Sequence, residues 1–315
     1  MNLKLRLLLF YINNFAKQID YSNVDAPTVR KINQAEFKKV SKLIDEPPLP
    51  MNKIEDAKIK MRDGAMIPIR IYHPTASKNQ PVFVFYHGGG FVTRSIETHD
   101  KVCRRLAKMN DMVVVSVGYR LAPEFPFPFP HQDCYDATVW VSAHGKQYNY
   151  NAEKMVVGGD SAGGKLATVT TILARDLNGP KISYQVLIYP TTDARLQFPS
   201  IDTYGKGYFL TKPLMQWFVN QYIPNKENIT NPLASPYLTE DLSNLPPAFV
   251  CTAELDPLKD EGAAYAKRLK AAGNPVIFKE YPNVVHGFFN LMKITRKTTT
   301  MLFEDIQKAL RMIMR

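Results

Sequence analysis

The feature that most limits how this chain can fold is the regular alternation of short apolar runs and longer amphipathic stretches. The runs are VFVFY (82–86), MVVVSV (112–117), KMVVG (154–158), YQVLIY (184–189), AFVCT (248–252) and VIFKEY (276–281). Helices are predicted near 98–109 and 132–144, from about 162, near 259–272 and near 297–314. Continuous β-branched runs between glycines and prolines favour strands buried on both faces of a parallel sheet. The alternation therefore predicts an α/β fold with a doubly wound, mostly parallel sheet.

Two segments depart from this alternation. Residues 57–72 read AKIKM, a turn RDGA, and IPIRIY, which predicts a hairpin that makes the sheet mixed. Residues 192–246 interrupt the pattern, and their middle (212–223) is predicted to be helical. Because a long insertion at the end of a strand is usually functional, we expect it to form a lid with the helices that precede the linker DEPPLP (45–50).

The stretch VVGGDSAGGKLA (156–167) fits two unrelated chemistries. Gly159 to Lys165 spells G-x-x-x-x-G-K, close to a phosphate-binding loop, whereas Gly159 to Gly163 spells G-x-S-x-G, the turn that presents a nucleophilic serine. A phosphate-binding loop needs Ser or Thr after its lysine to hold magnesium, and Leu166 stands there. A nucleophile turn needs a strand, small residues and a helix around Ser161, and the sequence supplies all three. The serine interpretation is therefore favoured.

A glycine-rich loop supports this interpretation. HGGGF (87–91) directly follows the run VFVFY, and successive glycines let backbone N–H groups approach a ligand closely. The amides of Gly89 and Gly90, with that of Ala162 after the serine, are the candidate oxyanion donors. We expect His87 to orient this loop rather than to act as a base.

An activated serine also needs a base and an orienting acid, which follow the serine in the order acid, then histidine. Only one of the six histidines, His286, lies after Ser161. The segment after run 248–252 offers four acids: Glu254, Asp256, Asp260 and Glu261. Asp256 is favoured because it precedes Pro257, which keeps it out of a helix, whereas acids in a first helical turn are common without catalysis.

Five motifs together carry a family resemblance. HGGGF, YRLAPE (119–124), GDSAGG, DPLKDEG and HGF occur in this order, and the chain resembles the hormone-sensitive-lipase-like esterases, bacterial lipolytic family IV. The resemblance implies an α/β-hydrolase fold with a sheet of about eight strands, and no cofactor or metal. It implies hydrolysis of carboxylic esters with short to medium acyl chains. The implied site consists of Ser161 as nucleophile, His286 as base, Asp256 as orienting acid, and Gly89, Gly90 and Ala162 as oxyanion donors.

The resemblance also divides the chain. Residues 1–50 would form the N-terminal helical part of a cap, 192–246 the inserted cap segment, and 51–191 with 247–315 the hydrolase core. Two alternatives to an esterase stay open. One is an amide hydrolase, such as a formamidase or deacetylase, on the same triad. The other is a non-catalytic small-molecule receptor, against which the presence of His286 argues.

Three positions depart from the family pattern. Lys165 stands where the family usually has Asn, Gly118 replaces the usual Asp before YRLAPE, and Arg94 occupies a position that is often Gly. None belongs to the triad, so the reaction type is unaffected. The departures instead concern the hydrogen bonds around the site and the rim of its pocket, where Arg94 is expected to point to solvent.

The charge distribution limits the partners. The net charge is +11, and residues 1–62 hold 12 Lys and Arg against 7 Asp and Glu. No nucleic-acid-binding motif accompanies this charge, so we interpret it as solvated helix faces and expect no nucleic-acid partner. The expected partner is a small-molecule ester. Contact of the basic first helix with a membrane surface is a minor alternative, and a homodimer is left open.

The start of the chain bears on location. Its apolar run (7–12) is shorter than the core of an export signal, and no A-x-A-like cleavage site follows. Apolar residues recur instead at helical spacing, which predicts an amphipathic helix: Leu5, Leu8, Leu9, Ile12 and Phe15. Three widely spaced cysteines, Cys103, Cys134 and Cys251, form neither a disulfide framework nor a zinc motif. A cytoplasmic location is expected.

Overall fold

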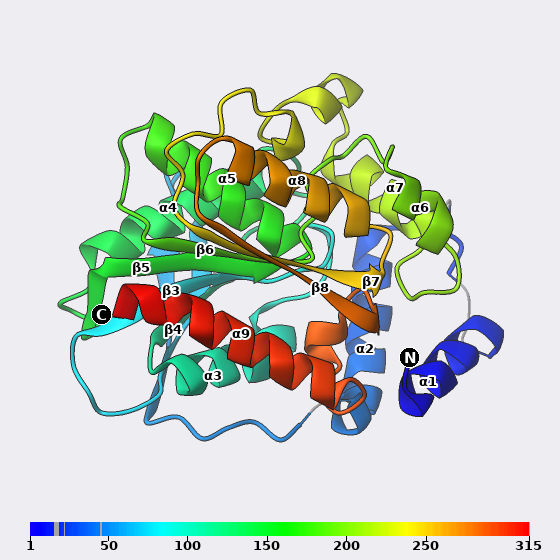
Figure 1. Cartoon of the computed structure of the whole chain (residues 1–315), viewed down its shortest axis with the longest axis horizontal. Coiled ribbons are helices and arrows are strands. Elements are labelled where there is room, and N and C mark those ends of the chain that lie inside the picture. The colour runs from blue at the N-terminus through cyan, green and yellow to red at the C-terminus, as the bar shows by residue number, and fades with distance from the viewer. Residues whose placement is uncertain (16–18, 22, 45, 315) are drawn as a thin grey trace.

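A computed structural model describes residues 1–15, 19–21, 23–44 and 46–314. Its centre is an eight-stranded sheet with the strand order β1-β2-β4-β3-β5-β6-β7-β8 (Figure 1). The strands are β1 (Lys53–Lys60), β2 (Met66–His73), β3 (Gln80–Tyr86), β4 (Val113–Val117), β5 (Tyr150–Asp160), β6 (Tyr184–Ile188), β7 (Ala248–Leu255) and β8 (Val276–Val285). The mostly parallel sheet that the sequence predicts is confirmed.

The pairing within the sheet follows the sequence pattern. β1 and β2 form the predicted antiparallel hairpin, and β2 also pairs antiparallel with β4. The strands from β4 to β8 run parallel to one another. Every residue of β4 and β6 is buried, as expected of apolar strands covered on both faces. The carboxyl ends of the parallel strands therefore meet at one edge of the sheet, where sites in such folds are built.

Helices cover both faces of the sheet (Figure 1). One face packs against α3 (Ile96–Asn110) and α9 (Arg296–Met314), and the other against α4 (Phe129–Ala143), α5 (Ala162–Asp176) and α8 (Lys259–Ala271). Alternate residues of β3 enter the two cores, with Val82 and Val84 on one side and Phe83 and Phe85 on the other. This alternation is the period of two that a strand imposes on its side chains.

Two segments lie beyond the carboxyl edge of the sheet. The insertion between β6 and β7 contains α6 (Pro199–Tyr204), α7 (Lys212–Tyr222) and the short helices η1 (Lys226–Thr230) and η2 (Pro236–Leu238). The N-terminal segment contains α1 (Leu3–Asn14) and α2 (Ala26–Ile44). The ring of Tyr21, in the N-terminal segment, lies 5.5 Å from the ring of Trp217 in α7, so the two segments pack against each other. The domain boundaries themselves stay a prediction.

Helix α1 differs in one respect from the sequence expectation. Leu5 and Leu9 are buried, but Phe15 lies just beyond the helix and is 67% exposed. The reason is that the helix ends at Asn14, so the helical spacing no longer holds for the next residue. Within the described residues, no helix combines the length and apolar character needed to cross a bilayer.

Candidate active site

The serine lies on a sharp turn between β5 and α5. Ser161 has φ of 56° and ψ of −118°, an unfavourable backbone conformation for a residue with a side chain. A Cβ atom on Gly163 would lie 1.9 Å from the carbonyl oxygen of Tyr86, and one on Gly159 would lie 2.2 Å from the same atom. The glycines around the serine are therefore needed because the end of β3 approaches the turn closely.

The structure brings the three predicted residues Ser161, His286 and Asp256 together, each at the end of a different parallel strand. His286 Nε2 lies 3.0 Å from Ser161 Oγ, and His286 Nδ1 lies 2.7 Å from Asp256 Oδ2. Asp256 is completely buried, and its Oδ1 accepts a hydrogen bond from the Leu258 amide at 2.8 Å. The carboxylate is thus held by one oxygen while the other faces the imidazole. This arrangement can take a proton from the serine hydroxyl.

The other three candidate acids lie elsewhere. Glu254 accepts a hydrogen bond from the Asn283 amide, Asp260 accepts one from the Ser200 amide, and Glu261 accepts one from the Thr192 amide. None of the three has a hydrogen bond to His286, because only Asp256 lies in the loop between β7 and α8 on the side of the imidazole.

The candidate oxyanion donors are free to bind a ligand. The amides of Gly89, Gly90 and Ala162 donate no hydrogen bond to any other residue of the described chain. The carbonyl oxygen of Gly89 holds the loop in a turn, because it accepts hydrogen bonds from the amides of both Val92 and Thr93. Unpaired amides next to a nucleophilic serine are what a tetrahedral oxyanion requires.

A buried contact between a carboxylate and a histidine ring joins this loop to the nucleophile turn. Asp160, directly before the serine, accepts a hydrogen bond from the Gly88 amide at 2.9 Å and lies 3.1 Å from His99 Nε2. Burial alone would raise the pKa of Asp160, but the neighbouring His99 and the Gly88 amide outweigh it and lower this pKa to about 2. The sequence motif contains Asp160, but only the fold places it beside His99.

The His87 side chain contacts the same loop. Its ring stacks on Tyr119 at 4.3 Å, and its Nδ1 lies 2.7 Å from the carbonyl oxygen of Gly88. Burial lowers the pKa of His87 to about 3, helped by the nearby His99. A neutral His87 donates its Nδ1 proton to the Gly88 carbonyl, which fits an orienting role.

Comparison with known proteins now adds to this geometry. A family model described as an alpha/beta hydrolase fold matches residues 83–290. The chain belongs to the alpha/beta hydrolases. It is 39% identical over 298 residues to an arylesterase of Saccharolobus solfataricus, covering 93% of this chain and 95% of that protein. It is 37% identical over 268 residues to an ethyl acetate hydrolase of Pseudomonas putida, covering 82% and 83%.

Solved structures agree with this assignment. A Pyrobaculum calidifontis esterase superposes on this alpha/beta hydrolase with a TM-score of 0.89 and 40% identity, covering 99% of both chains. The likeness to the hormone-sensitive-lipase-like esterases that the motifs indicate is confirmed. The roles of the individual site residues stay predictions, which the geometry above supports.

Lys165, which made a phosphate loop conceivable, has a different environment in this hydrolase. Its side chain is 2% exposed, and Nζ donates a hydrogen bond at 2.6 Å to the carbonyl oxygen of Ala234, in the inserted segment. The ammonium also lies 5.2 Å from the Phe91 ring and 5.6 Å from the Tyr222 ring. Burial lowers the pKa of Lys165, and the nearby carboxylates of Glu261 and Asp193 oppose this. Lys165 therefore joins the nucleophile helix to the inserted segment.

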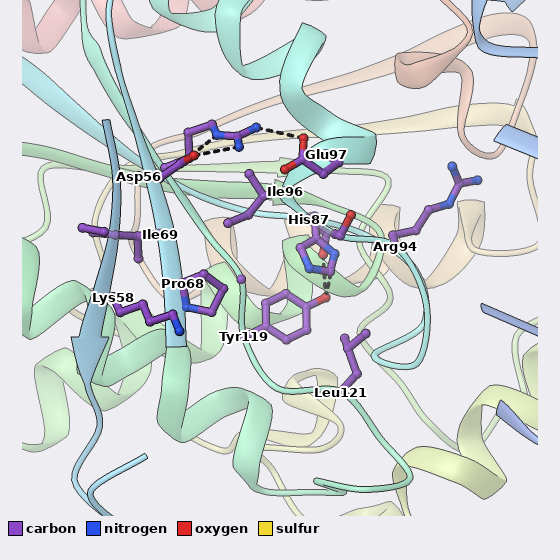
Figure 2. A pocket seen from close by; sticks show the side chains of 14 residues that line it. Asp56, Lys58, Pro68, Ile69, His87, Arg94, Ile96, Glu97, Tyr119 and Leu121 are labelled. Atoms are coloured by element: carbon purple, nitrogen blue, oxygen red, sulfur yellow. Dashed lines mark hydrogen bonds and ion pairs between the residues drawn. The ribbon is translucent and has the colours of Figure 1, made fainter. Parts of the chain in front are cut away.

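The other two unusual residues adjoin a cavity of about 560 Å³ (Figure 2). A Cβ on Gly118 would lie 2.8 Å from Pro68 Cγ, so the proline of β2 leaves no room for an aspartate there. Arg94 has φ of 73° and is half-buried, and Figure 2 shows its guanidinium pointing away from His87. None of the triad residues lines this cavity.

Sequence reasoning missed two residues that contact the oxyanion loop. Arg30 of α2 donates from Nε to the Val92 carbonyl at 2.7 Å and also pairs with Glu124. Phe218 of α7 covers Gly90, because a Cβ on this glycine would lie 2.4 Å from the ring. Both contacts join segments more than 60 residues apart, so no local pattern indicated them.

Replacing Gly90 with alanine is expected to lower kcat/KM on an ester about 10²–10³-fold, because the new methyl group collides with Phe218 and displaces an oxyanion amide. Removing the ring in Gly90→Ala/Phe218→Ala should restore part of this rate. Gly273→Ala is the matched control, since Gly273 also has positive φ but has open space around it. A double variant as slow as Gly90→Ala, with Phe218→Ala itself harmless, would contradict the collision.

Acid is expected to destabilise the fold through its buried histidines. Burial lowers the pKa of both His87 and His131 to about 3, below the value of about 6.5 in an unfolded chain. The unfolded chain then binds more protons below pH 6.5, so stability is full above that pH and is lost as pH falls toward 3. Between pH 6.5 and pH 5 the two histidines together should lower the free energy of unfolding by about 3 kcal/mol. Urea unfolding measures this, and an unchanged pH slope in His131→Gln would contradict it.

Proposed function

We propose that this alpha/beta hydrolase is a serine carboxylesterase that cleaves esters with short to medium acyl chains through an acyl-enzyme. The observation that carries the proposal is the continuous chain of hydrogen bonds from Asp256 through His286 to Ser161, beside unpaired amides. Relatives named arylesterase and ethyl acetate hydrolase, which match most of this chain, support the choice of ester bonds.

The reaction proceeds in two halves. His286 Nε2 takes the proton of Ser161 as Oγ attacks the ester carbonyl, and Asp256 stabilises the imidazolium. The negative oxygen of the tetrahedral intermediate accepts hydrogen bonds from the amides of Gly89, Gly90 and Ala162. His286 then returns the proton to the leaving alcohol. Water attacks the acyl-serine by the same route and releases the acid.

A small acyl group is favoured by the lid. Phe218 of α7 lies against Gly90, so an aromatic ring from the inserted segment closes the space directly over the oxyanion loop. An acyl chain that extends toward this ring must displace it, whereas the shortest acyl groups need not. The preference for short chains therefore follows from the contact between Phe218 and Gly90.

A series of p-nitrophenyl esters from acetate to palmitate tests the proposal, with the matching p-nitroanilides run in parallel. We expect the highest kcat/KM at acetate to hexanoate, a steep fall at longer chains, and slower cleavage of the anilides. An enzyme inert on all the esters but active on the anilides would be an amide hydrolase, and the proposal would be wrong.

We further propose a cytoplasmic location and a homodimer. The three cysteines Cys103, Cys134 and Cys251 are free and buried, which suits a reducing compartment. β8 is the last strand of the sheet and leaves Ile277 and Phe278 37% and 41% exposed, as an edge that pairs with a second copy would. Light scattering tests the dimer, which Phe278→Lys should dissociate; a monomeric wild type would contradict it.

A further inference from the structure

Helix α1 carries an apolar face that nothing in the described structure covers. Leu3 and Leu7 are 69% and 59% exposed, Phe10 and Tyr11 are each 59% exposed, and Phe15 is 67% exposed. Leu3, Leu7, Phe10 and Tyr11 are spaced by three or four positions within the helix, so they form one stripe. Phe15, just beyond the helix, extends the stripe, because its ring lies 5.8 Å from that of Phe10. Figure 1 shows α1 at the periphery of the molecule, next to α2. Contiguous exposed apolar side chains mark an interaction site more often than single ones do.

The helix is packed against the rest of the protein, so detachment does not explain this exposure. The opposite face is buried, with Leu5 and Leu9 packed in a cluster with Val285 and Leu291. Asn2 Nδ2 donates to the Ile294 carbonyl at 2.8 Å, and Asn13 Nδ2 donates to the Gly207 carbonyl at 3.1 Å. The helix is thus held at both ends, and the exposed stripe keeps a fixed direction.

Positive charges flank the stripe. Successive residues are rotated by about 100° in a helix, so Lys4 falls on one side of Leu7 and Arg6 on the other. Both cations are exposed, and no acidic side chain of the described chain pairs with either. The first 19 residues of the sequence contain no Asp or Glu at all. An apolar stripe between cations matches the boundary between acyl chains and anionic headgroups.

We propose that the outer face of α1, formed by Leu3, Leu7, Phe10, Tyr11 and Phe15, docks the enzyme on an anionic lipid surface. A second copy fits this face poorly. Two identical faces would place two Lys4 and two Arg6 side chains in one interface, with no acid on the helix to offset them. Anionic lipid instead supplies the opposite charge and the apolar layer together.

Docking would bring the active site to the lipid. Val285, against which α1 packs, directly precedes His286 on the chain. The docked helix therefore holds the loop of the candidate base near the headgroups. Access to esters that partition into lipid rests on the proposed esterase activity, whereas the docking itself does not.

Sedimentation with vesicles of ether-linked phospholipids tests the docking, because these lipids have no acyl ester for the enzyme to cleave. We expect the full chain to bind vesicles that contain phosphatidylglycerol at least tenfold more tightly than pure phosphatidylcholine, and to lose this difference at high salt. Leu7→Gln/Phe10→Ser should weaken binding at least tenfold. Leu177→Gln is the matched control, since Leu177 is 56% exposed and directly follows α5, a helix that Figure 1 shows away from α1.

A second variant keeps the test valid if the apolar substitutions disturb folding, which thermal unfolding reveals. Lys4→Gln/Arg6→Gln leaves the stripe intact and should weaken binding to phosphatidylglycerol at least fivefold, with no change for phosphatidylcholine. The proposal is overturned if wild type does not bind, if both variants bind as wild type does, or if the two lipids bind equally. It is also overturned if light scattering shows that Leu7→Gln/Phe10→Ser turns a dimer into a monomer, because the face would then hold a second copy.

Discussion

Ser161→Ala is expected to lower kcat on p-nitrophenyl butyrate about 10⁶-fold, the scale on which loss of a triad serine acts. The acyl-enzyme route depends on Ser161 Oγ, the only hydroxyl that has a hydrogen bond to His286 Nε2 in the described structure. Alanine leaves the amides of Gly89 and Gly90 in place, so a small residual rate from binding and polarisation should persist. Initial rates at saturating ester, corrected for spontaneous hydrolysis, measure the loss.

Ser142→Ala is the control for this substitution, because Ser142 lies near the end of α4 and its hydroxyl donates to the Val139 carbonyl, three residues earlier in the same helix. It should keep the wild-type rate. A fluorophosphonate probe adds a second measurement, since it should label wild type and Ser142→Ala once per chain and leave Ser161→Ala unlabelled. Labelling of Ser161→Ala, or a rate within tenfold of wild type, would mean that the nucleophile lies elsewhere.

The core of the fold could be predicted from sequence because its strands are nearly pure apolar runs. A run such as MVVVSV lacks the alternating polar residues of a strand with one face in solvent, so its composition alone indicates burial on both faces. The triad could be predicted for a different reason. His286 is the only histidine after Ser161, and Asp256 is separated from the following helix by Pro257, so chain order and local geometry left few choices.

Contacts between distant segments could not be predicted. Lys165 bonds to Ala234, 69 residues away, and nothing around either residue in the sequence indicates the other. The same holds for Phe218 against Gly90 and for Pro68 against Gly118. Each depends on where the inserted segment packs, or on how the hairpin strand β2 pairs with β4 in the sheet. The unusual residues Lys165 and Gly118 are therefore explained by tertiary packing, after the sequence alone had left them without a role.

Helix α1 illustrates a limit of periodicity. Helical spacing correctly predicted a helix with Leu5 and Leu9 on its buried side. The same helix also carries a second apolar stripe, which faces outward. The spacing of apolar residues does not show which of the two stripes packs against the rest of the protein. Packing against Val285 and Leu291 decides this, and these residues lie some 280 positions further along the chain.

Asp256→Asn is expected to lower kcat about 10⁴-fold while leaving the fold intact, and the hydrogen bonds of Asp256 explain why. Its Oδ1 accepts from the Leu258 amide and its Oδ2 faces His286 Nδ1. In the variant, the amide oxygen must stay on the Leu258 N–H, because an NH₂ group there would oppose another donor. The NH₂ group then points at Nδ1, which has to accept. The proton of the neutral imidazole moves to Nε2, where it blocks transfer from Ser161.

Asp260→Asn separates this effect from a general loss of negative charge. Asp260 lies four residues further on and accepts a hydrogen bond from the Ser200 amide at 2.9 Å, with no contact to His286. An asparagine oxygen can accept the hydrogen bond from the Ser200 amide equally well. We therefore expect kcat of Asp260→Asn to stay within about threefold of wild type. Rates of both variants across pH 6 to 9 provide the measurement. If Asp256→Asn kept more than a tenth of the wild-type kcat, or if Asp260→Asn were the slower of the two, Asp256 would not be the residue that orients the base.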